Sequence, residues 1–204
     1  YLFGCGSTSR FVARTYRSLN LDRIGSGLAD TENIYTNIDK MLGILVGAID
    51  VAKIYVYLLV LKFALIRFAE PVTQPNHMVL FGIFVLIGHC LPLTHHLRGG
   101  RGIFTYLGLV AFFAWMPMLL GGIVAFFVMF GFKQIRFGQY MIVILPSFFN
   151  LAINSLLPHA NIAFTSISSF PLVIIALIMG VLNILVSKRL GEIKSQNPKL
   201  TNLK

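Results

Sequence analysis

The chain has 204 residues, of which 56% are hydrophobic and only 12% are charged, and its mean hydropathy is +0.79. A soluble domain carries about 25% charged residues, so this composition excludes an ordinary soluble protein and predicts an integral membrane protein. The formal net charge of +10 does not require nucleic-acid binding, because the cytoplasmic loops of multi-span proteins collect Lys and Arg. We therefore expect no nucleic-acid partner.

In chain order, residues 1–13 look like the tail of a first, truncated span. The chain opens on Tyr1 rather than Met, so we expect an N-terminal piece to precede it, and no cleavable signal peptide is recognisable. The length suits a single membrane-embedded domain over residues 1–204. Cys5 and Cys90 adjoin apolar runs and are expected to be small buried side chains rather than a disulfide framework.

The later apolar runs cover 41–66, 78–93, 103–132, 140–157 and 170–187. The run 103–132 would form a helix of about 45 Å, which is longer than the membrane core of about 30 Å. Pro117 and the pair Gly121-Gly122 lie in its middle. Two short helices joined there and one tilted, kinked helix are both compatible with this pattern.

The positions of the basic residues favour two helices in 103–132. Seven spans then result, at 1–13, 41–66, 78–96, 103–117, 119–132, 140–157 and 170–187. The connections on one side carry nearly all the remaining Lys and Arg, and those on the other side carry only Arg67. The basic connections are 14–40, 97–102, 133–139 and 188–204. The positive-inside rule therefore predicts an all-α, multi-pass transmembrane helix bundle of about seven spans, in the plasma (inner) membrane with its basic loops cytoplasmic.

Two polar segments lie on the basic side. The first, NLDRIGSGLADTENIYT at 20–36, shows no helical period and predicts a loop or a re-entrant element. Such irregular backbone near a membrane is tolerated where it packs on protein or lines a wet cavity. Its glycines Gly25 and Gly27 are a possible anion-binding nest, with the hydroxyl of Ser26 between them. Two polar segments on one face suggest a single site.

The second polar segment is GHCLPLTHHLRGGRGIFT at 88–105. In the part from Arg98 to Gly102, the glycines let successive amides turn toward an anion, and the arginines supply forked donors that match phosphate oxygens. Ile103 then begins a helix whose amino end adds partial positive charge. This pattern predicts a phosphate cradle at the lipid surface. A basic anchor with a flexible turn is the alternative, and the stretch alone does not decide between them.

The remaining ionisable residues give weaker signals. His89, at the end of a span, is more often a packing residue than a functional one. His95 and His96 are adjacent and would point about 100° apart on a helix, so we expect neither a metal site nor a cofactor. Asp50 and Lys53 stand one turn apart within a span and are expected to pair structurally. Lys62 is expected to extend to the far interface.

The segment from Gly88 to Thr105 resembles the G-H-x-x-P…F-K-G-G-K-G-V-A-T signature of the PlsY family, membrane glycerol-3-phosphate acyltransferases that use acyl phosphate. The matching residues are Gly88, His89, Pro92, Arg98, Gly99, Gly100, Arg101, Gly102 and Thr105, with Arg where the family often has Lys.

Other stretches extend the resemblance over nearly the whole chain. YLFG at 1–4 and GSG at 25–27 resemble the opening Y-L-x-G-S-I-P…G-S-G-N-x-G-A-T-N, with Asn33 on the last Asn. DVAK at 50–53 resembles D-x-x-K-G, and KQIRFGQ at 133–139 lies where the family has R-Y-V-S-L-G-S. NILVSKRLGE, which begins at Asn183, loosely resembles the closing H-x-x-N-I-x-R-L-x-x-G-x-E.

The first and last motifs also contain departures, whereas the central glycine-rich motif is intact. Leu28 replaces Asn, Asp30 replaces Gly, and Thr36 replaces Arg in the first loop. The other departures are Cys5 for Ser, Ser7 for Pro, Arg136 for Ser and Gly180 for His.

The resemblance implies a seven-span fold that transfers an acyl group from acyl phosphate to the 1-hydroxyl of glycerol 3-phosphate, giving lysophosphatidic acid and phosphate, in contact with membrane lipid. It implies phosphate binding by Gly25, Gly27, Arg98, Gly99, Gly100, Arg101, Gly102 and Thr105. Ser26 and His89 would be catalytic, with His89 as base or orienting group, and Asn33 and Asn183 would hydrogen-bond the glycerol part. The departures at Leu28 and Gly180 favour the alternative of a non-catalytic paralogue or small transporter that binds a phosphorylated ligand.

Overall fold

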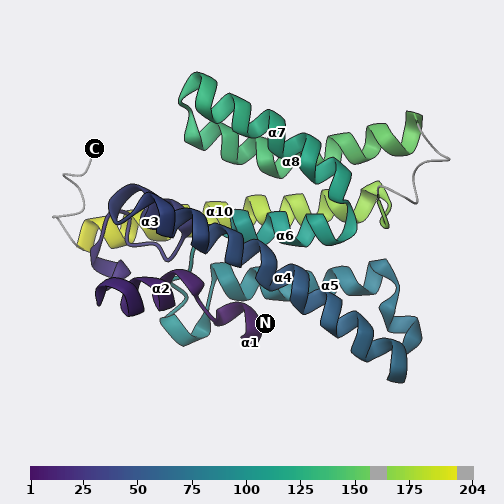
Figure 1. Cartoon of the computed structure of the whole chain (residues 1–204), viewed down its shortest axis with the longest axis horizontal. Helices are drawn as coiled ribbons and strands as arrows, with labels where there is room; N and C mark the ends of the chain where they lie inside the picture. Colours follow the sequence, from purple (N-terminus) through teal and green to yellow (C-terminus); the bar gives the residue numbers. More distant parts are fainter. Residues whose placement is uncertain (157–164, 197–204) are drawn as a thin grey trace.

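The computed structural model describes residues 1–156 and 165–196, and every described element is a helix (Figure 1). The α-helices are α1 Leu2–Cys5, α2 Thr8–Arg17, α3 Thr31–Asn37, α4 Lys40–Phe68, α5 Pro75–Cys90, α6 Ile103–Phe113, α7 Trp115–Phe132, α8 Ile135–Leu156 and α10 Ser169–Gln196. Short 3-10 turns are η1 Leu21–Arg23, η2 Glu70–Thr73 and η3 Leu93–His95. The predicted all-α class is confirmed.

Four helices in the described part of the chain are long and apolar enough to cross a membrane, namely those at 40–68, 75–95, 135–156 and 169–191. The helices Ile103–Phe113 and Trp115–Met129 are apolar but shorter. The multi-pass helix bundle is therefore confirmed, while the count of seven spans stays a prediction. Residues 1–13 do not form one helix, because α1 ends at Cys5 and the side chain of Ser7 caps a new helix by accepting from the Arg10 amide at 3.3 Å.

The run 103–132 consists of two helices, as the charge distribution predicts, but they join at Ala114 and not at Pro117. Proline has no N–H and its ring clashes with the carbonyl four residues earlier, which here belongs to Phe113. The helix therefore breaks one turn before the proline. The Phe113 carbonyl instead accepts from the amide of Ser166 at 2.7 Å and from its hydroxyl at 3.0 Å.

Two predicted loops are shorter than expected. The connection 133–139 is only the turn at Lys133 and Gln134, because α8 begins at Ile135. Residues 31–37 form α3, whose first turn is capped by the Asp30 carboxylate, which accepts from the Asn33 amide at 2.9 Å. A helix of seven residues is too short for its period to stand out among the polar residues of 20–36, which is why the sequence indicated only a loop.

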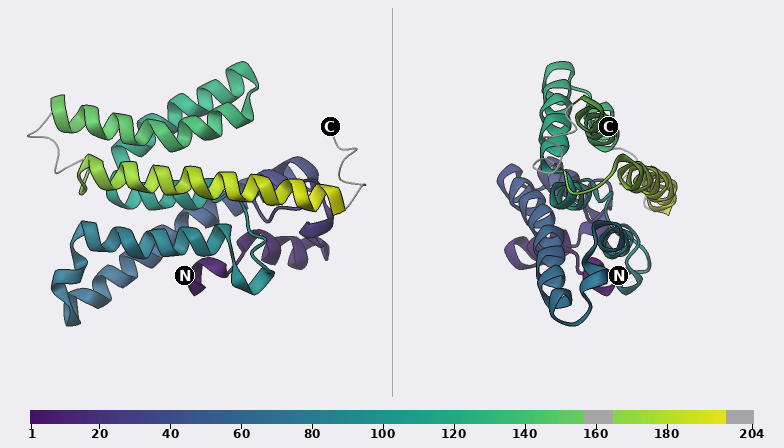
Figure 2. Two further views of the ribbon diagram at one scale, coloured as in Figure 1. Left: turned by 180° about the vertical axis from the view of Figure 1, so that it is seen from behind. Right: turned by 90° about the vertical axis from the view of Figure 1, so that its right-hand side faces the viewer.

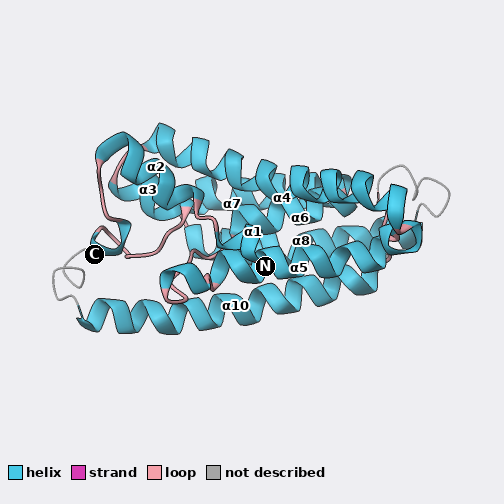
Figure 3. Cartoon of the chain, turned by 90° about the horizontal axis from the view of Figure 1, so that it is seen from below, coloured by secondary structure: helices cyan, strands magenta, loops and turns pink. Residues whose placement is uncertain are grey.

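The long helices run along one axis, with the hairpin of α7 and α8 on one side, α4 and α5 on the other, and α6 and α10 between them (Figures 1 and 2). Small residues allow the close contacts: a Cβ on Gly108 of α6 would lie 2.3 Å from the Val51 carbonyl oxygen of α4. Seen from below, α10 forms one edge of the molecule and α4 the opposite one (Figure 3). The largest buried apolar cluster draws on α4, α5, α6, α8 and α10.

The basic connections gather at one end of this bundle. There α2 and α3 lie near the C-terminal end of α10 (Figure 1), and Arg189 of α10 donates to the His96 carbonyl at 3.4 Å. Arg136, at the start of α8, contacts Glu32 of α3. The turn at Glu70–Thr73 and the junction at Ala114 lie at the other end. This arrangement brings the two polar segments together, as the sequence suggested.

Candidate functional site

The glycine-rich loop lies between the end of α5 and the start of α6, and it packs on protein backbone from two sides. The Gly100 amide donates to the His89 carbonyl at 3.4 Å, and the Ala29 amide donates to the Gly99 carbonyl at 3.3 Å. A Cβ on Gly99 would lie 2.2 Å from the His89 oxygen, and one on Gly100 would lie 2.5 Å from the Ala29 oxygen. Both glycines therefore allow a close approach of chain to chain.

The loop ends on a helix terminus that is suited to an anion. Gly102 precedes α6 with a positive φ of 74°, and no side chain caps the first turn of this helix. The uncapped amides and the helix dipole place partial positive charge there. The hydroxyl of Thr105, in the same turn, is buried and has no hydrogen-bond partner among the described residues. This first turn is therefore a part of the loop that could receive an anion.

The two arginines of the loop are placed differently. Arg101 is only 4% exposed, and its Nη1 donates to Asp30 Oδ2 at 3.2 Å and to Glu32 Oε2 at 2.7 Å. Arg98 lies at the exposed edge, where its carbonyl accepts from Nη2 of Arg10 at 2.6 Å. Arg101 is therefore the arginine that faces the interior of the site.

The carboxyl group of Asp30 is buried beside Arg101. Burial raises the pKa of Asp30 above its ordinary value, while the Arg101 guanidinium opposes that rise. The charge of Asp30 is thus more dependent on Arg101 than that of an exposed carboxylate, because an unpaired buried charge is strongly disfavoured.

The Gly25–Gly27 loop is held by Asn33. The Asn33 side-chain oxygen accepts from the Ser26 amide at 3.1 Å and from Asn37 at 3.0 Å, and its amide donates to the carbonyls of Ile24 and Leu28. Gly25 and Gly27 have positive φ angles of 54° and 73°. The buried Asn33 thus uses the hydrogen-bonding groups of its side chain to shape the loop, and its predicted contact with glycerol stays a prediction.

The amides of this first loop are also used internally. The Gly27 amide donates to the Ile24 carbonyl at 2.9 Å, and Ser26 Oγ accepts from the Leu28 amide at 3.4 Å. The amides of Ser26 and Gly27 thus already have partners within residues 24–33, and anion binding by this loop stays a prediction.

His89 is buried at the end of α5, and its ring lies next to Gly102, where a Cβ would be 3.7 Å from Cδ2. Its Nδ1 has no hydrogen-bond partner in the part of the chain that the structure describes. Asp50, Lys53 and Asp30 lie close enough to act on its charge. The imidazole is thus adjacent to the glycine-rich loop, as its predicted role requires.

Asp50 and Lys53 do not form the predicted ion pair among the described residues. Lys53 Nζ instead donates to the carbonyl oxygens of Gly4 and Gly6, which attaches α4 to α1 and to the residue just after it. The side-chain oxygen Oδ1 of Asp50 is buried without a partner there. Backbone carbonyls compete successfully for the lysine because the break after Cys5 exposes them.

The last predicted site residue, Asn183, is on α10 and donates to the Met179 carbonyl of its own helix at 3.0 Å. Further along α10, Arg189 is hydrogen-bonded to the segment before the glycine-rich loop, through the carbonyl of His96. No group of three or more His, Cys, Asp or Glu that could hold a metal ion is found in the described residues.

Comparisons with known proteins place the chain in a family. The profile of the family described as glycerol-3-phosphate acyltransferase matches residues 1–201. The chain belongs to the glycerol-3-phosphate acyltransferase family.

Related proteins of this name are moderately similar in sequence. The one from Mycoplasma mobile is 29% identical over 173 residues, covering 83% of this chain and 70% of that protein. The one from Shouchella clausii is 30% identical over 145 residues, covering 71% of this chain and 68% of that protein. Among solved structures, the glycerol 3-phosphate form of PlsY is 19% identical, with a TM-score of 0.72 over 100% of this chain and 90% of that one. The lysophosphatidic acid form of PlsY gives a TM-score of 0.64 at 20% identity, over 93% of this chain and 87% of that one. These structures show that the fold is shared.

Sequence reasoning did not assign a role in the candidate site to three neighbours of Arg101: Asp30, Glu32 and Gln139. Gln139 Nε2 donates to Glu32 Oε2 at 2.7 Å, and Arg136 Nη2 lies 3.5 Å from Glu32 Oε1. One signal could have found the acids. The chain has only 7 Asp and Glu, and two of them stand two residues apart in the first polar segment, on the side that is otherwise basic.

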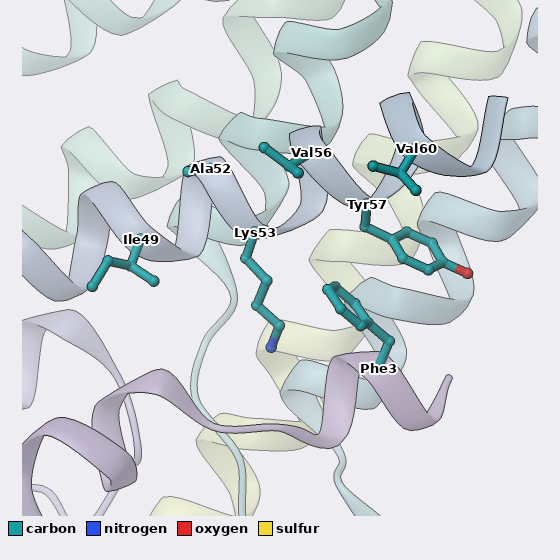
Figure 4. A pocket seen from close by; sticks show the side chains of 7 residues that line it. All are labelled: Phe3, Ile49, Ala52, Lys53, Val56, Tyr57 and Val60. Atoms are coloured by element: carbon teal, nitrogen blue, oxygen red, sulfur yellow. The ribbon is translucent and has the colours of Figure 1, made fainter. Parts of the chain in front are cut away.

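An apolar groove runs along α4 beside α1 in this family member (Figure 4). Its volume is about 460 Å³, and it is lined by Phe3, Ile49, Ala52, Lys53, Val56, Tyr57 and Val60. The rings of Phe3 and Tyr57, both in this lining, stack with their centroids 4.5 Å apart. Lys53, whose neighbour Asp50 lies within electrostatic reach of His89, is the one charged side chain among these lining residues.

Proposed function

We propose that this chain transfers an acyl group from acyl phosphate to the 1-hydroxyl of glycerol 3-phosphate, giving lysophosphatidic acid and phosphate, a first step of phospholipid synthesis. The observation that carries the proposal is the meeting of the glycine-rich loop, the buried Arg101 and the uncapped amino end of α6. Both small-molecule ends of the reaction carry a phosphate group, and this meeting point suits one.

The reaction mainly requires that the two substrates are held in the right relative position. The 1-hydroxyl oxygen forms a bond to the acyl carbonyl carbon, the bond from that carbon to the phosphate oxygen breaks, and the hydroxyl proton passes to a base or to the departing phosphate. Because phosphate is already a good leaving group, orientation and charge stabilisation suffice without a covalent enzyme intermediate. Buried beside Gly102, His89 is the candidate for accepting or orienting that proton.

The groove beside α1 supports a place for the acyl chain. Its lining is apolar apart from Lys53, and its volume falls in the range of about 300–1,000 Å³ that is usual for small-molecule sites. Because α4 is a membrane-spanning helix, an acyl chain could enter this groove from the surrounding lipid, which is as apolar as the lining.

An assay of the purified protein with palmitoyl phosphate and glycerol 3-phosphate tests the proposal. We expect release of phosphate together with formation of lysophosphatidic acid, and neither product when glycerol 3-phosphate is omitted. Binding of glycerol 3-phosphate without release of phosphate would favour the non-catalytic paralogue or transporter instead.

We further propose that the basic end of the bundle faces the cytoplasm across the plasma membrane. Cysteine labelling in sealed cells tests this, since Cys5 and Cys90 are buried and should give little background. Lys133→Cys is expected to resist a membrane-impermeant reagent, whereas Gln74→Cys at the opposite end should react. Reaction of the cysteine at 133 from outside would contradict the orientation.

A further inference from the structure

We propose that the carboxylate of Glu32 occupies the anion site of Arg101 and thereby sets how strongly the glycine-rich loop takes a phosphate group. This rests on the proposed function, in which a substrate phosphate binds at that loop. Glu32 would be a positioning residue that acts through Arg101 and Arg136.

The contacts of Glu32 place it between three elements. Its Oε2 accepts from Arg101 at 2.7 Å and from Gln139 at 2.7 Å, and its Oε1 lies 3.5 Å from Arg136. One carboxylate therefore connects the glycine-rich loop to the first turn of α8 across the start of α3. Paired donors of this kind, two arginines and an amide, are also the groups that bind phosphate oxygens in proteins.

Of the two acids on Arg101, Glu32 is the one that can move away. The side chain of Asp30 is 8% exposed and also caps α3, whereas that of Glu32 is 28% exposed. When Glu32 leaves, Asp30 still holds Arg101 in position. The guanidinium would then present a donor to phosphate from a fixed place.

The balance of charge gives the direction of the effect. Arg101 and Arg136 are matched here by two carboxylates, so a phosphate that approaches the cluster meets no net attraction. Asp30 and Arg136 are also positions at which the sequence departs from the quoted family motifs. The network is therefore a property of this chain, and it should make its phosphate binding weaker than the loop alone would allow.

Glu32→Gln tests this, because glutamine keeps the shape and one acceptor oxygen but removes the charge. We expect the Kd of glycerol 3-phosphate, measured by calorimetry on the purified protein, to fall about tenfold, since a like charge a few ångströms from the phosphate is removed. The KM for glycerol 3-phosphate should fall similarly while kcat stays within about twofold. This is the pattern expected when binding of the substrate and of the transition state is strengthened equally. Glu70→Gln, the same substitution at the far end, should change neither value.

Glu32→Asp separates charge from packing. It keeps the carboxylate, so its Kd should stay near that of the wild-type protein. An unchanged Kd in Glu32→Gln, or a higher Kd in both variants, would overturn the proposal and leave Glu32 as a structural ligand of Arg101. Calorimetry needs no turnover, so a wild-type protein that fails the acyl-transfer assay would defeat the proposed function while the binding comparison still decides the role of Glu32.

Discussion

Gly99→Val is expected to reduce acyl transfer by at least about 100-fold, because a displacement of about 1 Å at a reacting site has that order of effect. The new Cβ would meet the backbone oxygens of His89 and Cys90 at 2.2 and 2.5 Å. Backbone cannot rotate away as a side chain can, so the loop must shift and carry Arg101 and the first turn of α6 with it. Turnover with the two substrates, measured on detergent-purified protein, checks this.

The same contacts imply a loss of stability, which a valine facing only a ligand would not cause. Overpacking of this kind costs about 1–3 kcal/mol, so the thermal midpoint should also fall. Gly122→Ala is the matched control, because a Cβ on this residue of α7 meets nothing within 4 Å. Its activity should be unchanged, and the better helix propensity of alanine should preserve or raise stability. A folded Gly99→Val protein with normal turnover would support the loop as a simple basic anchor.

The sequence predicts the fold class and the meeting of the two polar segments because both depend on patterns of residue type that are visible in a single sequence. The long apolar runs and the one-sided distribution of Lys and Arg suffice for that. The junction at Ala114 was misplaced because the proline acts on the carbonyl of Phe113, four residues earlier, and because Ser166, which satisfies this carbonyl, is distant in sequence.

The place of the glycine-rich loop was predicted from the sequence, whereas its contacts were not. That Arg98 to Gly102 would form a central loop could be read from residue type and from the family resemblance. That Arg101 would be buried against Asp30 could not, because the pairing depends on how α3 packs on the loop, 71 residues away in sequence. Asn33 shows the same limit: its match to a family motif suggested a substrate contact, and no pattern indicated that its side chain would make three hydrogen bonds to residues 24–28 and one to Asn37.

Arg101→Ala should be the most damaging side-chain change, and it should act on both stability and catalysis. It leaves the carboxylate of Asp30 buried without its cation, and breaking a buried pair in this way costs about 3–5 kcal/mol. It also removes the charged donor to the substrate phosphate, which is worth about 1.5–3 kcal/mol. Thermal unfolding and kcat/KM for glycerol 3-phosphate should both show large losses.

A second variant separates the two effects. In Arg101→Ala combined with Asp30→Asn the uncompensated charge is gone, while an amide at position 30 can still accept from the Asn33 amide and cap α3. We expect much of the lost stability to return in this double variant, while kcat/KM stays near that of Arg101→Ala, because the phosphate donor is still missing. Recovery of transfer together with stability would mean that Arg101 only holds α3 against the loop. The phosphate site would then have to rest on the amino end of α6, whose first-turn amides and Thr105 hydroxyl do not depend on that guanidinium.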